Sequence, residues 1–203
     1  MEHTISIEHR DDAASRIGMW LFVFTELFLF AGLFTVFTVY RIKYHEGFHL
    51  AAQELNVTIG TINSIILLMS GMTMGIAYLA MQKSNKKLCL LLLAITIVLG
   101  IVFLVNKYFE WIVKIEHGLY PGSHDLIALG KGDIMFFGLY FFMTGLHALH
   151  LVAGLIFIII AYVGILRGKV HSQKYALLEN CSLYWHLVDL VWLFLFPLFY
   201  LIN

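Results

Sequence analysis

The stretch Leu88–Val113, which reads LCLLLLAITIVLGIVFLVNKYFEWIV, decides the fold class. A transmembrane helix needs about 20 consecutive and mostly apolar residues. This stretch is longer than that, and its only charged residues are Lys107 and Glu110. The sequence predicts four further spans, at Gly18–Tyr40, Val57–Met81, Ile134–Leu166 and Ala176–Ile202. The span that starts at Ile134 is over-long, so we expect it to tilt or to protrude from the bilayer.

Bulk composition points to the same class of protein. The 203 residues are 61% hydrophobic and 13% charged, whereas an average soluble domain is about 45–50% apolar and about 25% charged. The formal net charge is zero, which argues against a nucleic-acid partner because such partners need a basic patch. Residues 1–17 are polar, and the apolar run behind them is too long for a cleavable signal peptide. We therefore predict one all-α domain, residues 1–203, built as an integral membrane bundle of five transmembrane helices.

Basic residues are distributed unevenly between the two ends of the predicted spans. One side has eight, namely Arg10, Arg16, Lys83, Lys86, Lys87, Arg167, Lys169 and Lys174. The other side has four, namely Arg41, Lys43, Lys114 and Lys131. Because Lys and Arg accumulate in cytoplasmic loops, we expect the N-terminus in the cytoplasm and the C-terminus outside. Lys107 lies inside the third span near its outer end, and we expect its long side chain to reach the interface.

Small residues and cysteines indicate close packing between helices. Gly71 and Gly75 have GxxxG spacing in the second span, which lets helices approach, and the hydroxyl of Ser70 beside them can bond across helices. Cys89 and Cys181 lie near the starts of their spans, without CxxC spacing. We interpret them as small buried hydrophobes rather than as a disulfide or a metal site.

Six ionisable residues lie within the apolar spans or at their ends and are the candidates for function. Such a group costs roughly 2.5–3.5 kcal/mol on insertion scales. Each of them is therefore expected to face the bundle interior, a lipid headgroup or a water path. The six are Glu26, Glu110, His147, His150, His186 and Asp189.

The histidines allow two interpretations. His147 and His150 are three residues apart in the fourth span and share a helix face. With His186 of the fifth span they could supply a bis-histidine haem site or a small metal site. Alternatively, these imidazoles form hydrogen bonds between helices or contact lipid headgroups, which the aromatic residues around His186 favour. We interpret the histidines of the turn-rich loop HGLYPGSH, His117–His124, as solvated.

The carboxylates also have competing interpretations. Glu26 lies about eight residues into the first span, roughly 12 Å deep, among phenylalanines. It is either a proton-relay or lipid-contact carboxyl, or a protonated side chain bonded to a neighbouring helix. Glu110 lies near the outer end of the third span. Glu179, His186 and Asp189 are spaced to form a polar stripe on the fifth, in which Asp189 could bond the ring of His186. Lipid tails cannot satisfy such a stripe, so we expect it to face a partner helix or a headgroup.

Several motifs of the chain occur together in one family. Met19–Phe34 reads MWLFVFTELFLFAGLF, and Thr144–Gly154 reads TGLHALHLVAG. Tyr184–Leu201 reads YWHLVDLVWLFLFPLFYL and is the most specific motif. Isolated matching positions are Asn63, Ser70, Gly71, Gly100, Phe103, Glu110 and Glu179. In these motifs the chain resembles subunit III of the haem–copper respiratory oxidases, the cytochrome c oxidase subunit III family.

The sequence departs from the family pattern in two respects. Many members have seven helices, and in them lipids lie in a cleft between a two-helix and a five-helix bundle. This sequence resembles a short form without the first two helices, so one wall of that cleft must come from another subunit or be absent. Lys107 and Trp111 stand where the family often has Gln and Tyr.

The resemblance implies a chain that is not itself catalytic and is part of an oxidoreductase complex. That complex oxidises cytochrome c or quinol, reduces dioxygen to water and moves protons across the cell inner membrane. Subunit III packs against catalytic subunit I, holds phospholipid and supports proton uptake. Haem and copper are expected in partner subunits, which would include subunit II and a small subunit IV. The resemblance implies that Glu26 supports proton uptake. It assigns contacts to lipid or between helices to Glu110, His147, His150, Glu179, His186 and Asp189.

Two other functions fit the sequence. A related short branch of the family serves as an accessory membrane subunit of nitric oxide reductases, and the large partner chain would distinguish it. A small membrane cytochrome could use His147 or His150 with His186 as haem ligands, and it would show a Soret band on the isolated chain.

Overall fold

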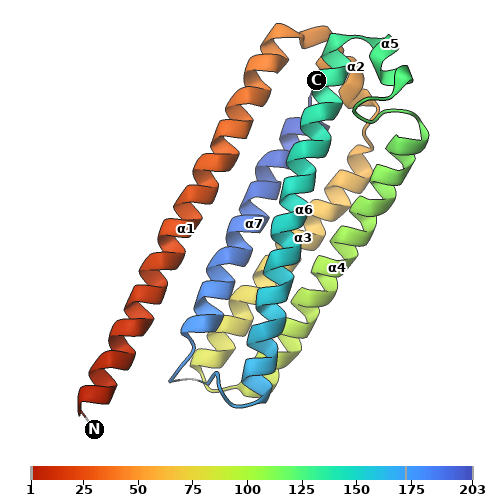
Figure 1. Cartoon of the computed structure of the whole chain (residues 1–203). Helices are drawn as coiled ribbons and strands as arrows, with labels where there is room; N and C mark the ends of the chain where they lie inside the picture. The colour runs from red at the N-terminus through yellow and green to blue at the C-terminus, as the bar shows by residue number, and fades with distance from the viewer. Residues whose placement is uncertain (1, 172, 203) are drawn as a thin grey trace.

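The structure, a computed structural model, describes residues 2–171 and 173–202, with side chains from Ala14 onward. Within these ranges the chain folds into helices without a strand (Figure 1). The helices are α1 (Glu2–Lys43), α2 (His45–Gln53), α3 (Val57–Gln82), α4 (Lys86–Glu116), α5 (His124–Leu129), α6 (Lys131–Leu166) and α7 (Ala176–Tyr200).

Five helices are long and apolar enough to cross a membrane, namely α3, α4, α6, α7 and the part Ala14–Lys43 of α1. The predicted fold class, an all-α bundle of five transmembrane helices, is confirmed. Most helices extend past the predicted spans: α1 begins at Glu2 rather than Gly18, and α4 begins at Lys86. Polar residues outside the hydrocarbon continue the backbone hydrogen-bond ladder, so helix length exceeds apolar length. By contrast, α7 ends at Tyr200, before the predicted Ile202.

The short helices α2 and α5 lie where the sequence predicts only polar connections. Side-chain oxygens at the helix starts accept backbone N–H groups that have no partner within the helix. Ser123 Oγ accepts from Leu126 N at 3.1 Å at the start of α5. At the starts of α3 and α4, the side-chain oxygens of Asn56 and Asn85 each accept a backbone N–H, with N···O distances of 3.2 Å. The loop His117–His124 therefore ends in a helix cap.

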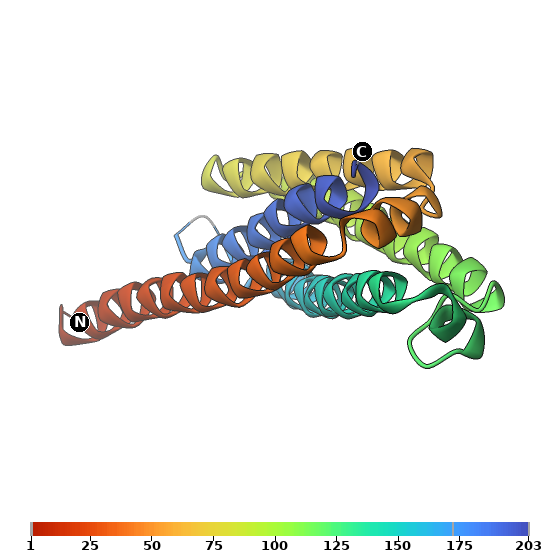
Figure 2. The ribbon, with the colours of Figure 1, turned by 90° about the horizontal axis from the view of Figure 1, so that it is seen from above.

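Helix α7 is central to the bundle. It packs against α1, α3 and α6, while α4 packs against α3 and α6. Seen from above, α7 lies between α1 and α3 (Figure 2). In the described residues α1 contacts only α2, α6 and α7, so it lies at the edge of the bundle.

Trp185 connects four of the long helices. Its indole N–H donates to Ser70 Oγ of α3 at 2.8 Å, which confirms the prediction that this hydroxyl bonds across helices. The ring lies against Gly100 of α4 and Gly154 of α6, where an added Cβ would come within 2.9 Å of it. The two glycines therefore make room for a fully buried tryptophan.

The basic connections gather at one end of the bundle. The α3–α4 and α6–α7 connections lie at the end that also holds the N-terminus, and the C-terminus lies at the opposite end (Figure 1). Lys86 Nζ donates to the carbonyl oxygen of Leu166 at 3.4 Å, which joins the two connections. The predicted orientation depends on these basic connections lying at the same end of the bundle as the N-terminus. Which side of the membrane each end faces stays a prediction.

Candidate functional site

A buried ion pair lies between α4, α6 and α7. Lys107 Nζ donates to Glu110 Oε2 at 3.2 Å, to the Tyr140 hydroxyl at 3.0 Å and to the Tyr200 hydroxyl at 2.6 Å. The Tyr140 hydroxyl donates to Glu110 Oε1 at 2.7 Å, and the Tyr200 hydroxyl donates to the same oxygen. All three ammonium donors and both carboxylate oxygens therefore have partners. We name this set of four residues the Lys107 cluster.

The Lys107 cluster corrects one expectation from the sequence. Lys107 does not reach the interface, because its side chain is 2% exposed and points into the bundle. Its ammonium group also lies over the rings of Tyr140, Trp192 and Tyr200, at 4.7, 5.2 and 5.2 Å from the centroids. Aromatic faces attract a cation, most strongly where water is absent. The cluster therefore compensates the burial of the charge and joins three helices.

His147 lies in the core beside this cluster. The side chain is buried, and neither ring nitrogen has a hydrogen-bond partner among the described residues. The Phe103 ring meets it edge-on at 5.7 Å between centroids, and the Trp192 ring lies at 5.2 Å. The imidazole is therefore enclosed by aromatic rings.

His150, one turn further along α6, faces α1 instead. Its Nε2 lies 2.9 Å from Glu26 Oε2, and its Nδ1 lies 2.8 Å from the carbonyl oxygen of Leu146. A carbonyl only accepts, so Nδ1 carries a proton. The Nε2–Oε2 contact then holds one further proton, on the imidazole or on the carboxyl. His150 and Glu26 thus share one proton in this contact, which joins α1 to α6.

The predicted polar stripe on α7 is divided between two sites. Glu179 forms an ion pair with Arg16 of α1, at 2.8 Å. One residue later, Asn180 Nδ2 donates to Ser15 Oγ of α1 at 2.8 Å. These contacts fix the first part of the membrane-spanning segment of α1 against α7. Glu179 therefore does not share a partner with the rest of the stripe.

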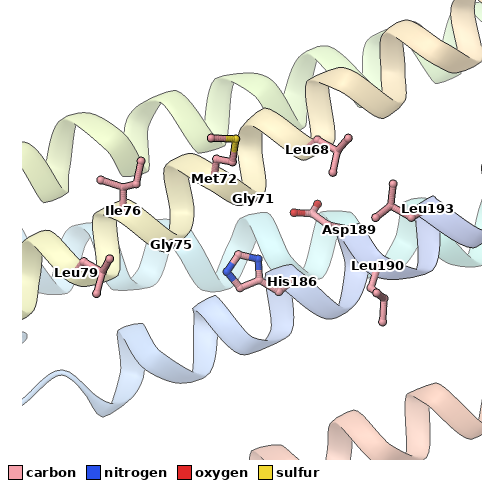
Figure 3. Close-up of a pocket in the computed structure, with 10 residues that line it drawn as sticks. All are labelled: Leu68, Gly71, Met72, Gly75, Ile76, Leu79, His186, Asp189, Leu190 and Leu193. Atoms are coloured by element: carbon pink, nitrogen blue, oxygen red, sulfur yellow. The ribbon is translucent and has the colours of Figure 1, made fainter.

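His186 and Asp189 instead face a groove between α7 and α3. The groove has a volume of about 520 Å³. Both side chains point towards Gly71 and Gly75 of α3 (Figure 3). Neither carboxyl oxygen of Asp189 has a hydrogen-bond partner among the described residues. The hydrogen bond that Asp189 could make to the His186 ring is therefore not formed, although both side chains lie against Gly71 of α3.

The candidate haem ligands do not face a common space. His147 is enclosed by Phe103 and Trp192, and His150 is bound to Glu26 and Leu146. His186 opens on the groove beside α3. In the part of the chain that the structure describes, no group of three or more His, Cys, Asp or Glu side chains could hold a metal ion. The geometry thus argues against the small-cytochrome alternative.

The cysteines are free and buried, as the sequence predicts. Cys89 is fully buried. Cys181 is also buried, and its thiol donates to the carbonyl oxygen of Phe157 at 3.4 Å.

Comparison with known proteins identifies the family. The family model described as cytochrome c oxidase subunit III matches residues 1–203. The chain belongs to the cytochrome c oxidase subunit III family. A probable cytochrome c oxidase subunit 3 of Rickettsia prowazekii is 32% identical over 97% of this chain and 73% of that protein. A probable quinol oxidase subunit 3 of Staphylococcus saprophyticus is 28% identical over 99% of this chain and 95% of that protein.

A third relative of this subunit III chain has a composite name. The heme-copper oxidase subunit I+III of Aeropyrum pernix is 32% identical over 92% of this chain and 22% of that protein. The match therefore covers the part of the longer protein that is similar to a subunit III.

Some residues of the site are not singled out by the sequence. Tyr140 and Tyr200 complete the Lys107 cluster from α6 and α7. Each is one tyrosine among apolar residues, and such residues are also typical of membrane interfaces. Their depth in the bundle and their common partner become visible only in three dimensions.

Proposed function

We infer that this chain acts as the non-catalytic subunit III of a haem–copper terminal oxidase in the inner membrane. The match of the family model to residues 1–203 carries this conclusion. The oxidase would oxidise cytochrome c or quinol, since relatives of both names occur. It would reduce dioxygen to water and move protons across the membrane. Haem and copper belong to the partner subunits.

In this complex the chain would pack against catalytic subunit I. The name of the Aeropyrum pernix relative, subunit I+III, supports subunit I as a direct partner. Subunit II and a small subunit IV would complete the assembly. The charged and polar side chains support a scaffolding role, because the Lys107 cluster and the Arg16–Glu179 pair both join helices.

The Glu26–His150 pair would support proton uptake, and phospholipid would bind beside it. Both side chains are part-buried, with 15% and 13% exposed, so they border the surface of the bundle. A carboxyl and an imidazole that share a proton can pass it on with little change in geometry. A lipid beside the pair would keep bulk water away from this exchange. Glu110, His147 and Glu179 would serve as contacts between helices.

Mass spectrometry of the proteins that co-purify with this chain from native membranes in mild detergent tests the proposed function. We expect a large haem–copper subunit together with a copper-binding subunit. A nitric oxide reductase large subunit instead would move the function to denitrification. The absence of any such partner, with a Soret band on the chain itself, would refute the proposal.

A further inference from the structure

The groove between α3 and α7 contains a polar group that has no partner among the described residues. Asp189 is only 7% exposed, and both of its carboxyl oxygens are buried without a hydrogen bond. His186 lies one turn away and is exposed in the same groove. The remaining lining is apolar or glycine. A buried polar group without a partner is costly, so something outside this chain is expected to satisfy it.

The depth of Asp189 argues against a lipid headgroup as that partner. At 1.5 Å per residue, Asp189 lies about 20 Å from Ala176 and about 16 Å from Tyr200, the two ends of α7. The hydrocarbon core is about 30 Å thick, so the carboxyl group lies near its middle. Acyl chains offer no hydrogen-bond donor there. A donor on a second protein segment would satisfy the carboxyl group at this depth.

The shape of the groove suits a helix. In the described residues α1 and α3 do not contact each other, and each packs on α7 from its own side (Figure 2). Gly75 leaves the α3 backbone open at the groove, and small residues of this kind allow helices to approach closely. Met72 of α3 and Leu190 and Leu193 of α7 line the groove and are exposed. They provide an apolar surface on both sides of the polar group.

We propose that this groove docks one transmembrane helix of catalytic subunit I, and that this helix presents a hydrogen-bond donor to Asp189. The proposal rests on the proposed function and adds the surface and the chemistry of the contact. A second copy of this chain fits less well. A twofold contact centred on the groove would bring two Asp189 carboxyl groups together, and His186 is the one lining side chain that could offer them a donor.

Photocrosslinking in the assembled oxidase tests the position of the contact. A photoreactive amino acid replaces Met72, which is 67% exposed in the groove, and a control replaces Val98, which is 58% exposed on α4. After illumination of native membranes, the purified complex is analysed by mass spectrometry. We expect the Met72 position to crosslink to a transmembrane helix of subunit I and the Val98 position not to do so. Crosslinks from Met72 only to lipid, or to a second copy, would overturn the proposal.

Two substitutions test whether the contact with subunit I needs the Asp189 carboxyl group and the open space beside Gly75. Gly75→Ala fits within the chain, because the added Cβ would lie 3.8 Å from His186 Nε2, but it fills the groove. Asp189→Leu removes a group that has no partner in the described part of the chain, so the chain itself should fold. We expect each to weaken retention of this subunit by subunit I roughly ten-fold in detergent titrations, since an interhelical contact of this kind has about that effect.

Gly138→Ala is the control, because no atom lies within 4 Å of the added Cβ, and we expect retention to be unchanged. Parent-like retention of both groove variants would overturn the proposal while leaving the proposed function intact. If the unmodified chain does not co-purify with a haem–copper subunit at all, the proposed function fails and the docking proposal fails with it.

Discussion

The ammonium group of Lys107 lies 3.2 Å from the carboxylate of Glu110 inside the bundle, and the two side chains are 2% and 3% exposed. Desolvation of two charges costs as much as their attraction returns unless hydrogen bonds satisfy the remaining donors and acceptors. Here Tyr140 and Tyr200 supply those bonds from two other helices. The pair is therefore compatible with the core only as part of the complete cluster.

Lys107→Met should be strongly destabilising, because it leaves the Glu110 carboxylate buried without its counter-charge. Breaking one partner of a buried pair costs about 3–5 kcal/mol. The labelling rate of Cys89, which is free and fully buried, measures the opening of the bundle in the purified complex. We expect much faster labelling by a thiol reagent, detected by the mass of this subunit.

Two variants control this experiment. Lys87→Met removes an exposed lysine from the same helix and should leave the labelling rate unchanged. Lys107→Gln combined with Glu110→Gln removes both charges and retains hydrogen-bonding groups, so it should recover most of the lost stability. If the single and the double variants label equally fast, the missing charge is not the cause.

Gly154→Ala should loosen the bundle by overpacking. The added Cβ would lie 2.9 Å from Trp185 Cε3 and 3.1 Å from Tyr184 Cε1, and neither ring can move freely in the core. Overpacking of this kind costs about 1–3 kcal/mol. Gly138→Ala on the same helix meets no atom within 4 Å and should be neutral. Thermal unfolding of the complex, followed by Cys181 labelling, compares the two; equal midpoints would contradict the packing argument.

Glu26→Gln should keep the fold and impair function. Glutamine can still bond His150, but it cannot exchange a proton as a carboxyl does. We expect slower proton uptake and faster inactivation during turnover of the assembled oxidase. Glu116→Gln, the same change at an exposed position at the end of α4, should behave as the parent. If Glu26→Gln leaves turnover, proton uptake and inactivation unchanged, the carboxyl has no functional role.

The predicted orientation can be tested by labelling intact cells with a membrane-impermeant thiol reagent. The natural cysteines are buried, so they give a low background. Ser84→Cys lies in the α3–α4 connection and Glu116→Cys at the opposite end of α4. With the N-terminus in the cytoplasm, Glu116→Cys should react in intact cells and Ser84→Cys only after permeabilisation. The reverse labelling pattern would place the N-terminus outside and would contradict the predicted orientation.

Sequence predicts the spans well because apolar length is a property of contiguous residues. Each span needs only its own residues to be recognised, and all five occur as helices. Helix ends are less predictable, as the start of α1 at Glu2 shows, because a helix continues after its apolar residues stop. The short helix α5 depends on its Ser123 cap, and α2, which has no side-chain cap, depends on packing of its buried residues.

The sequence predicts which site residues lie inside the spans, but it does not predict which helix their side chains contact. Spacing places Lys107 in the third span, yet its partners Tyr140 and Tyr200 are 33 and 93 residues away in sequence. Spacing also places Asp189 on the same face as His186, but Asp189 forms no hydrogen bond with it. A helical pattern identifies which residues share a face; it does not identify the helix that the face meets.

The contact between Glu26 and His150 also constrains how the protein is made. The two residues are 124 positions apart in the chain. At about 5–20 residues per second, synthesis of that stretch takes roughly 6–25 seconds. During this interval the first helix is already in the membrane, and its carboxyl group has no imidazole to bind. Until α6 arrives, Glu26 therefore has to be accommodated without His150, as a neutral acid or beside another polar group.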